Sequence, residues 1–418
     1  MKKLALHWKI LIGMVLGVLF GAILSFVPSG SEFIKDYIKP FGTIFINLLK
    51  LIAVPLILAS LIKGVSDLKD ISKLSQMGGR TILTYLITTL TAVTIGLILV
   101  NVIQPGKSIS VETRNELVEA YATNTQEKQA AAAKQKEAGP LNALVEIVPS
   151  NIFLAASNNR NMLQVIFFAL FFGIGMILLP AKKIKPVKKF FDSFNAIILK
   201  LIDLIMLAAP YGVFALLAAL VVEAPSLELF QALALYAITL LLGLAAMILV
   251  YIIIVRIFTG KKTDFFMKGI APAQLLAFST SSSAATLPVT MECVEENLGV
   301  DKEVASFVLP IGATINMDGT SVYQGVAAVF IAQAFGLDLS LSAQLGIVFT
   351  ATLASIGTAA VPSAGIVMLV IVLAQAGIPE AGLALIFAID RPLDMCRTIV
   401  NVTGDAAVSM IVGKSIGK

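Results

Sequence analysis

Long apolar runs alternate with short polar linkers along the first 260 residues of the chain. Six runs of roughly membrane-spanning length lie at 10–28, 41–62, 81–103, 161–180, 194–222 and 229–257. An α-helix needs about 20 apolar residues to cross the hydrocarbon core of a bilayer. The pattern therefore predicts an all-α protein that crosses a membrane several times.

From about residue 264 the apolar pattern is interrupted three times by small and polar residues. Residues 278–288 read FSTSSSAATLP, residues 310–320 read PIGATINMDGT, and residues 355–365 read SIGTAAVPSAG. Irregular backbone at membrane depth is tolerated only where protein buries it or where it lines a cavity. Interrupted segments also mark the binding sites of transporters. Surface loops between short helices are the alternative, but the first and third stretches carry no charge, which argues against exposed loops.

Composition narrows the class of protein. Of the 418 residues, 58% are hydrophobic and 14% are charged, and the mean hydropathy is +0.92, whereas soluble domains carry about 25% charged residues. A cytosolic enzyme is therefore excluded. The formal charge of +5 comes from loop residues and forms no aromatic-interleaved basic patch, so no nucleic-acid partner is expected. The expected surroundings are a lipid bilayer.

Basic residues gather in alternate linkers. Residues 182–189 contain five lysines and no acid, and two further basic groups flank the linkers near 63–80 and 256–268. The positive-inside rule places these linkers and the N-terminus in the cytoplasm. The polar, mixed-charge segment 106–140 is then an external loop. We expect a multi-pass protein of the inner (plasma) membrane.

The chain has few of the residues that enzymes use for acid–base or metal catalysis. The single histidine, His7, precedes the first apolar run, and the two cysteines, Cys293 and Cys396, have no metal-ligand or disulfide spacing. Histidine-based acid–base or metal catalysis is therefore excluded from the body of the protein. Neither an HExxH nor a GxSxG motif occurs.

The final apolar run, 382–413, contains costly charges. They are Asp390, Arg391, Asp394, Arg397 and Asp405, together with the amide of Asn401. At about 100° per residue, all of these except Arg391 fall within an arc of roughly 80° on one helix face. Each charge at the bilayer centre costs about 2.5–3.5 kcal/mol, so charges kept there have partners or a function.

These residue types indicate a solute with charges of both signs. The guanidinium of Arg397 suits a carboxylate ligand, and Asp394, one turn away, suits an ammonium group. Together they describe an acidic amino acid. Asp405 has no cation nearby on its helix. Asn316 and Asp318 are likewise oxygen-bearing polar side chains within apolar sequence. Such residues favour the binding of a hard cation such as Na⁺, or of a proton. The alternative is an ion-pair ladder between helices, built on Arg397 and Asp394, but it leaves Asp405 unexplained.

The motifs SSSAATLP, GATINMDGT, SIGTAAVPSAG and DMCRTIVNVTGD resemble those of the dicarboxylate/amino-acid:cation symporters, the glutamate transporter family, and the resemblance covers essentially the whole chain. It implies eight transmembrane helices and two re-entrant helical hairpins with inverted repeats, the hairpin tips lying near Ser281–Thr286 and Ala359–Gly365. It also implies a homotrimer with an elevator mechanism. Scaffold helices 1–2 would occupy residues 1–75, and the external loop with scaffold helices 4–5 residues 106–222. The transport domain would comprise helix 3 at 76–105, helix 6 at 223–258 and the core at 259–418.

The resemblance also implies the residues that hold substrate and ions. Arg397 and Thr320 would bind the side-chain carboxylate, Asp394 and Thr398 the amino group, and Asn401 the α-carboxylate. The hairpin tips would contribute Ser282, Ser283, Val361 and Gly365. Sodium ions would occupy three sites, formed by Gly312, Asn316, Asn401 and Asp405; by Thr314, Ser355, Ile356 and Thr358 beside Met317; and by Tyr85, Thr88, Thr89, Asn316 and Asp318.

Departures from the family pattern bear on coupling and specificity. Gln324 stands where acid-transporting animal relatives have a proton-coupling Glu, which argues against proton co-transport with potassium return. Ser281 and Met395 stand where relatives have an arginine, and Arg391 is an additional cation that is a candidate replacement.

Several alternatives stay open or are disfavoured. A proton-coupled acidic amino-acid carrier remains open, because relatives of both coupling types share the NMDG motif. A C4-dicarboxylate symporter is the other alternative, which Asp394 argues against. Arg397 disfavours a neutral amino-acid carrier, and the asymmetric Arg397/Asp394 pair disfavours an ion channel.

Overall fold

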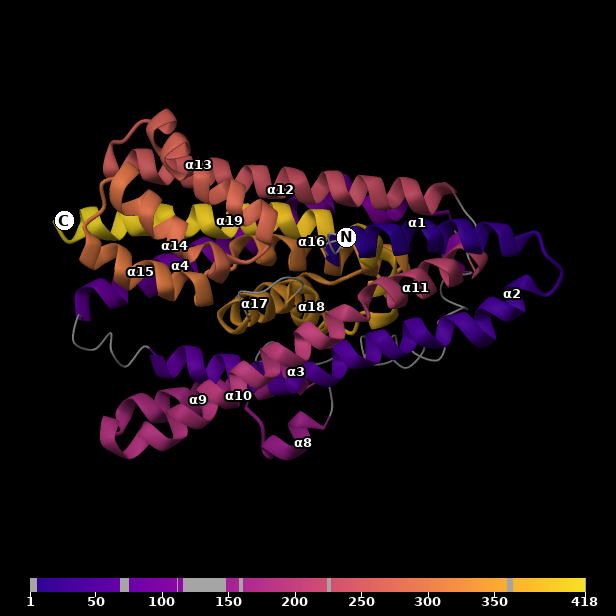
Figure 1. The fold of residues 1–418 in the computed structure, drawn as a ribbon, viewed down its shortest axis with the longest axis horizontal. Coiled ribbons are helices and arrows are strands. Elements are labelled where there is room, and N and C mark those ends of the chain that lie inside the picture. The colour runs from indigo at the N-terminus through magenta and orange to yellow at the C-terminus, as the bar shows by residue number, and fades with distance from the viewer. Residues whose placement is uncertain are drawn as a thin grey trace, which may run out of the picture.

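The computed structural model describes residues 6–67, 75–110, 112–115, 148–157, 161–223, 227–358 and 364–417. Within these residues the chain folds into helices and contains no strand. Most long helices run side by side along the longest axis of the molecule (Figure 1). This arrangement confirms the all-α class that the apolar runs predict.

One group of helices comes from the first half of the chain. Its members are α1 (Leu6–Ser25), α3 (Lys39–Asp67), α9 (Met162–Leu178), α10 (Ala181–Leu207) and α11 (Ala209–Glu223), with the short α2 (Gly30–Phe33), a π-helical turn (Ile34–Ile38) and α8 (Ile152–Ala156) at its margins. Helix α3 packs on α9, α10 and α11, and α1 packs along α11. Gly13, Gly17 and Gly21 lie against the backbone of α11, where a Cβ would collide with Pro210, Phe214 and Ala218. These glycines permit close helix packing.

The apolar run at 194–222 is not one straight helix. It is divided at Ala208 between α10 and α11, whose axes differ by 50°. Pro210 lies in the first turn of α11, where it lacks an N–H to continue the hydrogen bonding of α10. The sequence pattern missed this bend because both halves are apolar.

A second group of helices surrounds the C-terminal helix. Helix α19 (Leu383–Ser415) contacts α12 (Leu227–Thr259), α13 (Thr263–Thr280), α15 (Lys302–Ile315) and α16 (Asp318–Ala334), and α4 (Ser75–Ile103) lies against α16. The remaining members are α14 (Ser283–Glu292), α17 (Leu341–Gly357) and α18 (Ala364–Gln375), with a 3₁₀ turn after α4 (Pro105–Ser108), a π-helical turn after α14 (Cys293–Asn297) and a 3₁₀ turn before α19 (Glu380–Gly382). Every described side chain of α16 is buried, so this helix lies at the centre of the group.

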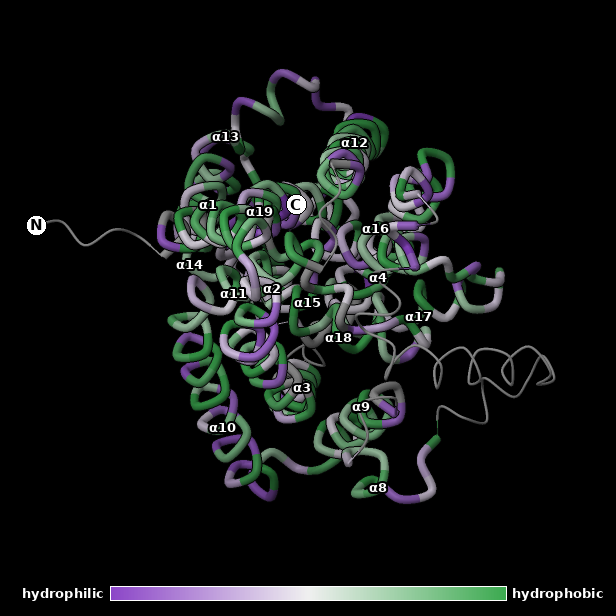
Figure 2. The backbone as a smooth tube through the Cα atoms, turned by 90° about the vertical axis from the view of Figure 1, so that its right-hand side faces the viewer, coloured by the Kyte–Doolittle hydropathy of each residue, from purple (hydrophilic) through white to green (hydrophobic). Residues whose placement is uncertain are grey.

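Several helices have the length and composition of membrane spans. Among the described residues, four are long and apolar enough to cross a bilayer, and the bent α10–α11 pair would make a fifth. Viewed along the bundle, apolar residues dominate most helices (Figure 2). The protein is thus a multi-pass membrane protein, while the expected total of eight spans and two re-entrant hairpins stays a prediction.

Each of the three predicted interruptions falls between two helices. Helix α13 ends at Thr280 and α14 begins at Ser283, with Ser281 in the left-handed region at φ 52°. Helix α15 ends at Ile315 and α16 begins at Asp318. Helix α17 ends at Gly357 and α18 begins at Ala364; residues 359–363, which include Val361, lie outside the described residues.

Candidate functional site

The three helix breaks and the middle of α19 meet at one small cavity. The lining comes from the break after α13 and the start of α14, the break before α16 and its first turn, the residue after α17, the start of α18 and one face of α19. These residues are Ser281, Ser283, Met317, Thr320, Thr358, Ala364, Gly365, Asp394, Thr398 and Asn401. The space open to water-sized molecules is about 10 Å³, which is roughly the room of one water molecule. An amino acid enters only if part of this lining moves.

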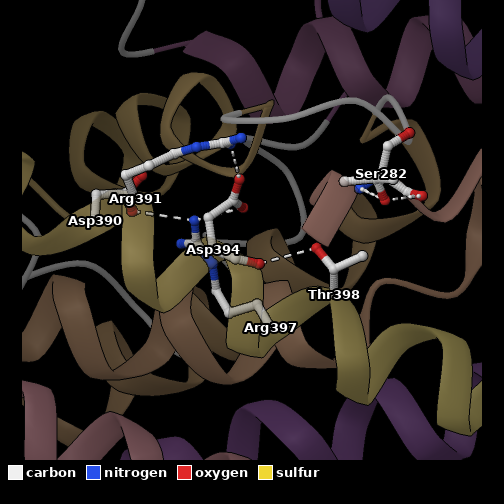
Figure 3. Close-up of polar contacts among 7 residues, drawn as sticks. Ser282, Asp390, Arg391, Asp394, Arg397 and Thr398 are labelled. Carbon is white, nitrogen blue, oxygen red and sulfur yellow. Dashed lines mark hydrogen bonds and ion pairs between the residues drawn. The ribbon is translucent and has the colours of Figure 1, made fainter. Parts of the chain in front are cut away.

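Four charged side chains of α19 form a network beside the cavity (Figure 3). Arg397 Nη2 lies 2.8 Å from Asp394 Oδ1 and 3.1 Å from Asp390 Oδ1. The other carboxylate oxygen of Asp394, Oδ2, lies 3.1 Å from Arg391 Nη1. The network holds two cations and two anions, so its formal charge is zero.

Arg397 is fully buried, and only part of its guanidinium is used. Its Cζ lies 3.8 Å from the centre of the Tyr323 ring on α16, an arrangement that stabilises a buried cation. The Nε and Nη1 atoms have no hydrogen-bond partner among the described residues. Unpaired buried donors are costly, so these two atoms point to an acceptor that an incoming ligand would supply.

The network lies next to the cavity without filling it. Gly365 lines the cavity, and a Cβ built on it would lie 3.7 Å from Arg397 Nη1 and 3.0 Å from the Thr320 side chain. A larger residue at 365 would therefore narrow the approach to Arg397. Thr398 lines the cavity one turn away, its hydroxyl donating to the Asp394 carbonyl at 2.9 Å.

Asn401 connects α19 to the break before α16. Its Oδ1 accepts a hydrogen bond from the Gly319 N–H at 2.8 Å, and its Nδ2 lies 3.4 Å from Met317 Sδ. At the same break, Ser355 of α17 accepts from the Met317 N–H and donates to the Ile315 carbonyl, each at 3.2 Å. Side chains from two other helices thus satisfy the backbone that the break frees.

Two further buried carboxylates, Asp405 and Asp318, accept hydrogen bonds from amide and hydroxyl groups. Asp405 Oδ1 accepts from Asn316 Nδ2 at 2.8 Å. Asp318 accepts from Thr89 Oγ1 at 2.7 Å and from the Tyr251 hydroxyl at 2.5 Å. All of these side chains are buried. Neither carboxylate forms an ion pair within the described part of the chain, and Asn316 Oδ1 has no partner there.

The carboxylate region has the composition of a hard-cation site. Its oxygens come from carboxylates, an amide and hydroxyls, which are the ligands that such cations take. A Cβ on Gly312 would collide with both the Tyr85 hydroxyl and Asp405 Oδ1, so only glycine leaves this space open. The residues present therefore fit a cation that would compensate the buried negative charge.

The other residues expected from the sequence are placed less directly. Ser283 lines the cavity with Ser281, whereas the Ser282 hydroxyl caps α14 by accepting from the Ala285 N–H at 3.2 Å. Tyr85 donates to the Val308 carbonyl, and Thr88 donates to the Tyr85 carbonyl. Thr314 is exposed, and its hydroxyl donates to the carbonyls of Pro310 and Ile311 in its own helix. Ile356 lies in the last turn of α17, just before Thr358.

Two residues that contact the charged side chains of the site, Tyr251 and Tyr323, were not predicted from the sequence. Tyr251 lies within the apolar stretch LVYIII of α12, and Tyr323 follows Thr320 on α16. A tyrosine in an apolar helix is usually part of the core, so the sequence gives no signal that these two rings reach Asp318 and Arg397.

The structure also bears on the ion-pair ladder between helices. Among the described residues, the ion pairs seen for Asp390, Arg391, Asp394 and Arg397 join side chains of α19 itself. These three ion pairs do not join α19 to another helix, which argues against a purely adhesive role for them.

Comparison with known proteins gives a consistent result over the whole chain. Residues 6–415 match the sodium:dicarboxylate symporter family. The chain is 36% identical to a proton/sodium-glutamate symport protein of Geobacillus stearothermophilus, covering 100% of this chain and 96% of that protein. It is 34% identical to the proton/glutamate-aspartate symporter of Escherichia coli (strain K12), covering 99% and 93%. It is 38% identical to excitatory amino acid transporter 3 of Mus musculus, covering 98% and 85%.

Proposed function

The chain belongs to the sodium:dicarboxylate symporter family, and from this premise we propose that it takes up aspartate or glutamate together with sodium ions. The family consists of secondary transporters, so the protein is not an enzyme. Relatives named as glutamate or glutamate-aspartate symporters support an acidic amino acid as the substrate.

The proposal rests mainly on the burial and the incomplete hydrogen bonding of Arg397. This guanidinium is fully buried beside a cavity, and it has two nitrogen atoms without a partner among the described residues. A planar, permanently charged fork of donors matches a carboxylate. We assign the substrate's side-chain carboxylate to Arg397, with the Thr320 hydroxyl beside it.

The remaining polar lining suits the other end of the same molecule. Asp394 and Thr398 accept the amino group, and Asn401 donates to the α-carboxylate. The backbone N–H groups of the tips, at Ser282, Ser283, Val361 and Gly365, complete the binding of the α-carboxylate. A C4-dicarboxylate has no amino group and would leave Asp394 without that partner, which is why an amino acid is preferred.

Sodium ions are cargo in this scheme. One ion binds between Asp405, Asn316, Asn401 and the Gly312 carbonyl, and another among Tyr85, Thr88, Thr89, Asn316 and Asp318. A further ion binds the carbonyls of Thr314, Ser355, Ile356 and Thr358 beside Met317. Two carboxylates without an ion pair among the described residues, and Asn316 Oδ1 without a hydrogen-bond partner among them, support these assignments. Moving one charge through 100 mV is worth about 2.3 kcal/mol, so several coupled ions drive steep accumulation.

Substrate access requires movement, because the cavity has room for about one water molecule. We propose that the tips open over the site and that the transport domain, residues 76–105 and 223–418, then moves as an elevator against the scaffold of a homotrimer. The protein lies in the inner membrane with both termini in the cytoplasm. The packing of the site within α4 and α12–α19 supports this division.

Proton coupling is the second candidate. The E. coli relative is named a proton/glutamate-aspartate symporter and others are named proton/sodium symporters. A buried carboxylate without a basic partner, such as Asp405, is able to take up a proton instead of a metal ion.

Uptake measurements test the proposal. Purified protein in proteoliposomes is supplied with labelled aspartate, glutamate or succinate, while sodium and proton gradients are imposed separately. We expect concentrative uptake of an acidic amino acid under an inward sodium gradient at equal pH on both sides. Uptake of succinate but of neither amino acid would contradict the proposed substrate. Uptake driven only by a proton gradient would show that protons, and not sodium ions, are the coupling ions.

A further inference from the structure

The first three turns of α10 form the most strongly basic stretch of the described chain. Residues 182–189 carry Lys182, Lys183, Lys185, Lys188 and Lys189, and the next acid is Asp192. All of these lysines are exposed except Lys188, which is half-buried. In Figure 2, hydrophilic turns alternate with hydrophobic ones along α10. The proposed transport cycle makes no use of this region.

Three of the lysines share one face of the helix. Lys182, Lys185 and Lys189, here called the lysine face, are spaced three and four residues apart and fall within an arc of about 60°. Ile184 is buried and lies on the opposite side of the helix. The lysine face therefore points away from the packed interior.

The placement of these lysines is unfavourable within the protein alone. Like charges three and four residues apart repel one another, and cations in the first turns of a helix oppose its dipole. Asp192, the acid next along the helix, lies 3.9 Å from Lys63 of α3. The lysine face forms no ion pair with a described acid, so an anion from outside the protein would be stabilising.

Apolar side chains beside the lysine face indicate what lies next to it. Leu178 at the end of α9 is 80% exposed and Phe190, one residue after Lys189, is 61% exposed. In a membrane protein, large exposed apolar side chains of this kind face lipid. The lysines thus lie where lipid-facing surface gives way to water, and their apolar stems are long enough to reach along that boundary.

We propose that the lysine face binds the phosphate headgroups of anionic phospholipids. The charge is complementary, and basic clusters directly beside membrane-spanning segments attract anionic lipids. The lipid tails then lie against the exposed apolar side chains of α9 and α10. This site is distinct from the substrate and ion sites and does not depend on the proposed transport function.

Lipid retention by the full-length protein tests the proposal. Purified protein in neutral detergent is mixed with equal amounts of phosphatidylglycerol and phosphatidylcholine, and native mass spectrometry measures the lipid that each variant retains. We expect the wild type to prefer phosphatidylglycerol, and this preference to weaken as ionic strength rises. The triple variant K182Q/K185Q/K189Q should lose about tenfold or more of it.

Matched variants distinguish an effect of the lysine face from an effect of the net charge of the protein. K182R/K185R/K189R keeps the positive charge of the lysine face and should keep the preference. K35Q/K107Q/K200Q removes the same charge from other exposed lysines and should also keep it. If the triple glutamine variant fails to fold, the single variant K185Q should show a partial loss.

Three results would overturn the proposal. They are no preference in the wild type, an unchanged preference in the glutamine variants, and an equal loss in K35Q/K107Q/K200Q.

Discussion

The two ends of the polar face of α19 handle buried charge differently. Toward the N-terminal end, Asp390, Arg391, Asp394 and Arg397 neutralise one another within a single helix. Two to three turns further on, Asp405 faces Asn316, with Asp318 nearby on α16. Within the part of the chain that the structure describes, the donors that reach these two carboxylates are amide and hydroxyl groups. The first region is electrically complete without a ligand, whereas the second carries an excess of negative charge.

This difference separates two kinds of binding. A ligand of the first region exchanges partners with existing ion pairs, so geometry and matching of both charges decide which solute is accepted. A cation bound in the second region compensates a buried negative charge. Leaving such a charge without a partner in a protein interior costs several kcal/mol. The first region therefore suits selection of a zwitterionic solute, and the second suits capture of a cation.

The largest effect is expected from removing Arg397. R397C takes away the guanidinium whose Nε and Nη1 atoms have no hydrogen-bond partner among the described residues, and it leaves two buried carboxylates with less compensation. Binding of aspartate and glutamate should weaken by about a hundredfold or more, while weak binding of neutral amino acids remains. Competition of unlabelled amino acids with labelled substrate measures this.

A control separates charge from shape at this position. R397K retains the charge but not the planar fork, so its affinity should fall between those of the wild type and R397C. Aspartate affinity in R397C equal to that of the wild type would remove the substrate assignment of Arg397.

The next largest effect is expected from D405N. This variant keeps the shape of Asp405 but removes a charged ligand, so the sodium concentration for half-maximal transport should rise about tenfold or more. The protein without sodium should be at least as stable as the wild type, since an uncompensated charge is gone. Thermal melting at several sodium concentrations should therefore show a smaller sodium-induced shift.

D390N is the matched comparison, because it also neutralises one buried carboxylate of α19. Its carboxylate is paired with Arg397, so D390N should change substrate affinity more than sodium dependence. If D390N and D405N alter sodium dependence equally, the distinction between the two ends of α19 is wrong.

The smallest effect is expected from Y251F. Loss of the hydroxyl leaves Asp318 with one donor fewer, at a cost of about 1–3 kcal/mol in the free energy of unfolding. The melting temperature without sodium should drop by a few degrees, and sodium should restore part of the loss because a cation compensates the same carboxylate.

Y236F provides an internal reference for Y251F. Tyr236 lies on the same helix and is equally buried, but its hydroxyl has no partner within the described residues. Its removal should leave the melting temperature nearly unchanged. Equal destabilisation by both variants would show that the Tyr251–Asp318 hydrogen bond adds nothing.

Much of the architecture could be read from local sequence. The apolar runs predicted the helices, and the three small-residue stretches predicted the breaks at Ser281, Asn316 and the end of α17. The spacing of Asp394, Arg397, Asn401 and Asp405 predicted one polar face. These predictions succeeded because helix periodicity and helix-breaking residues act over a few neighbouring positions.

Other features depend on contacts between distant segments. The bend at Ala208 was hidden in a continuous apolar run, and Arg391 lies outside the predicted arc although its long side chain reaches Asp394. Tyr251 and Tyr323 look like ordinary core residues in the sequence. Nothing local distinguishes a tyrosine that packs from one that contacts a charge on another helix.

The sequence by itself determined that the protein is helical, crosses a membrane, and keeps a small set of charges where charge is costly. Only the tertiary structure decided how those charges are shared: which carboxylates have an arginine, and which depend on hydroxyl and amide donors from α4, α12 and the break before α16. The reason is physical. The burial of a residue and the helical repeat of polar and apolar positions follow from residue type and spacing along one helix. Charge compensation depends instead on which side chains the fold brings within about 3 Å of each other.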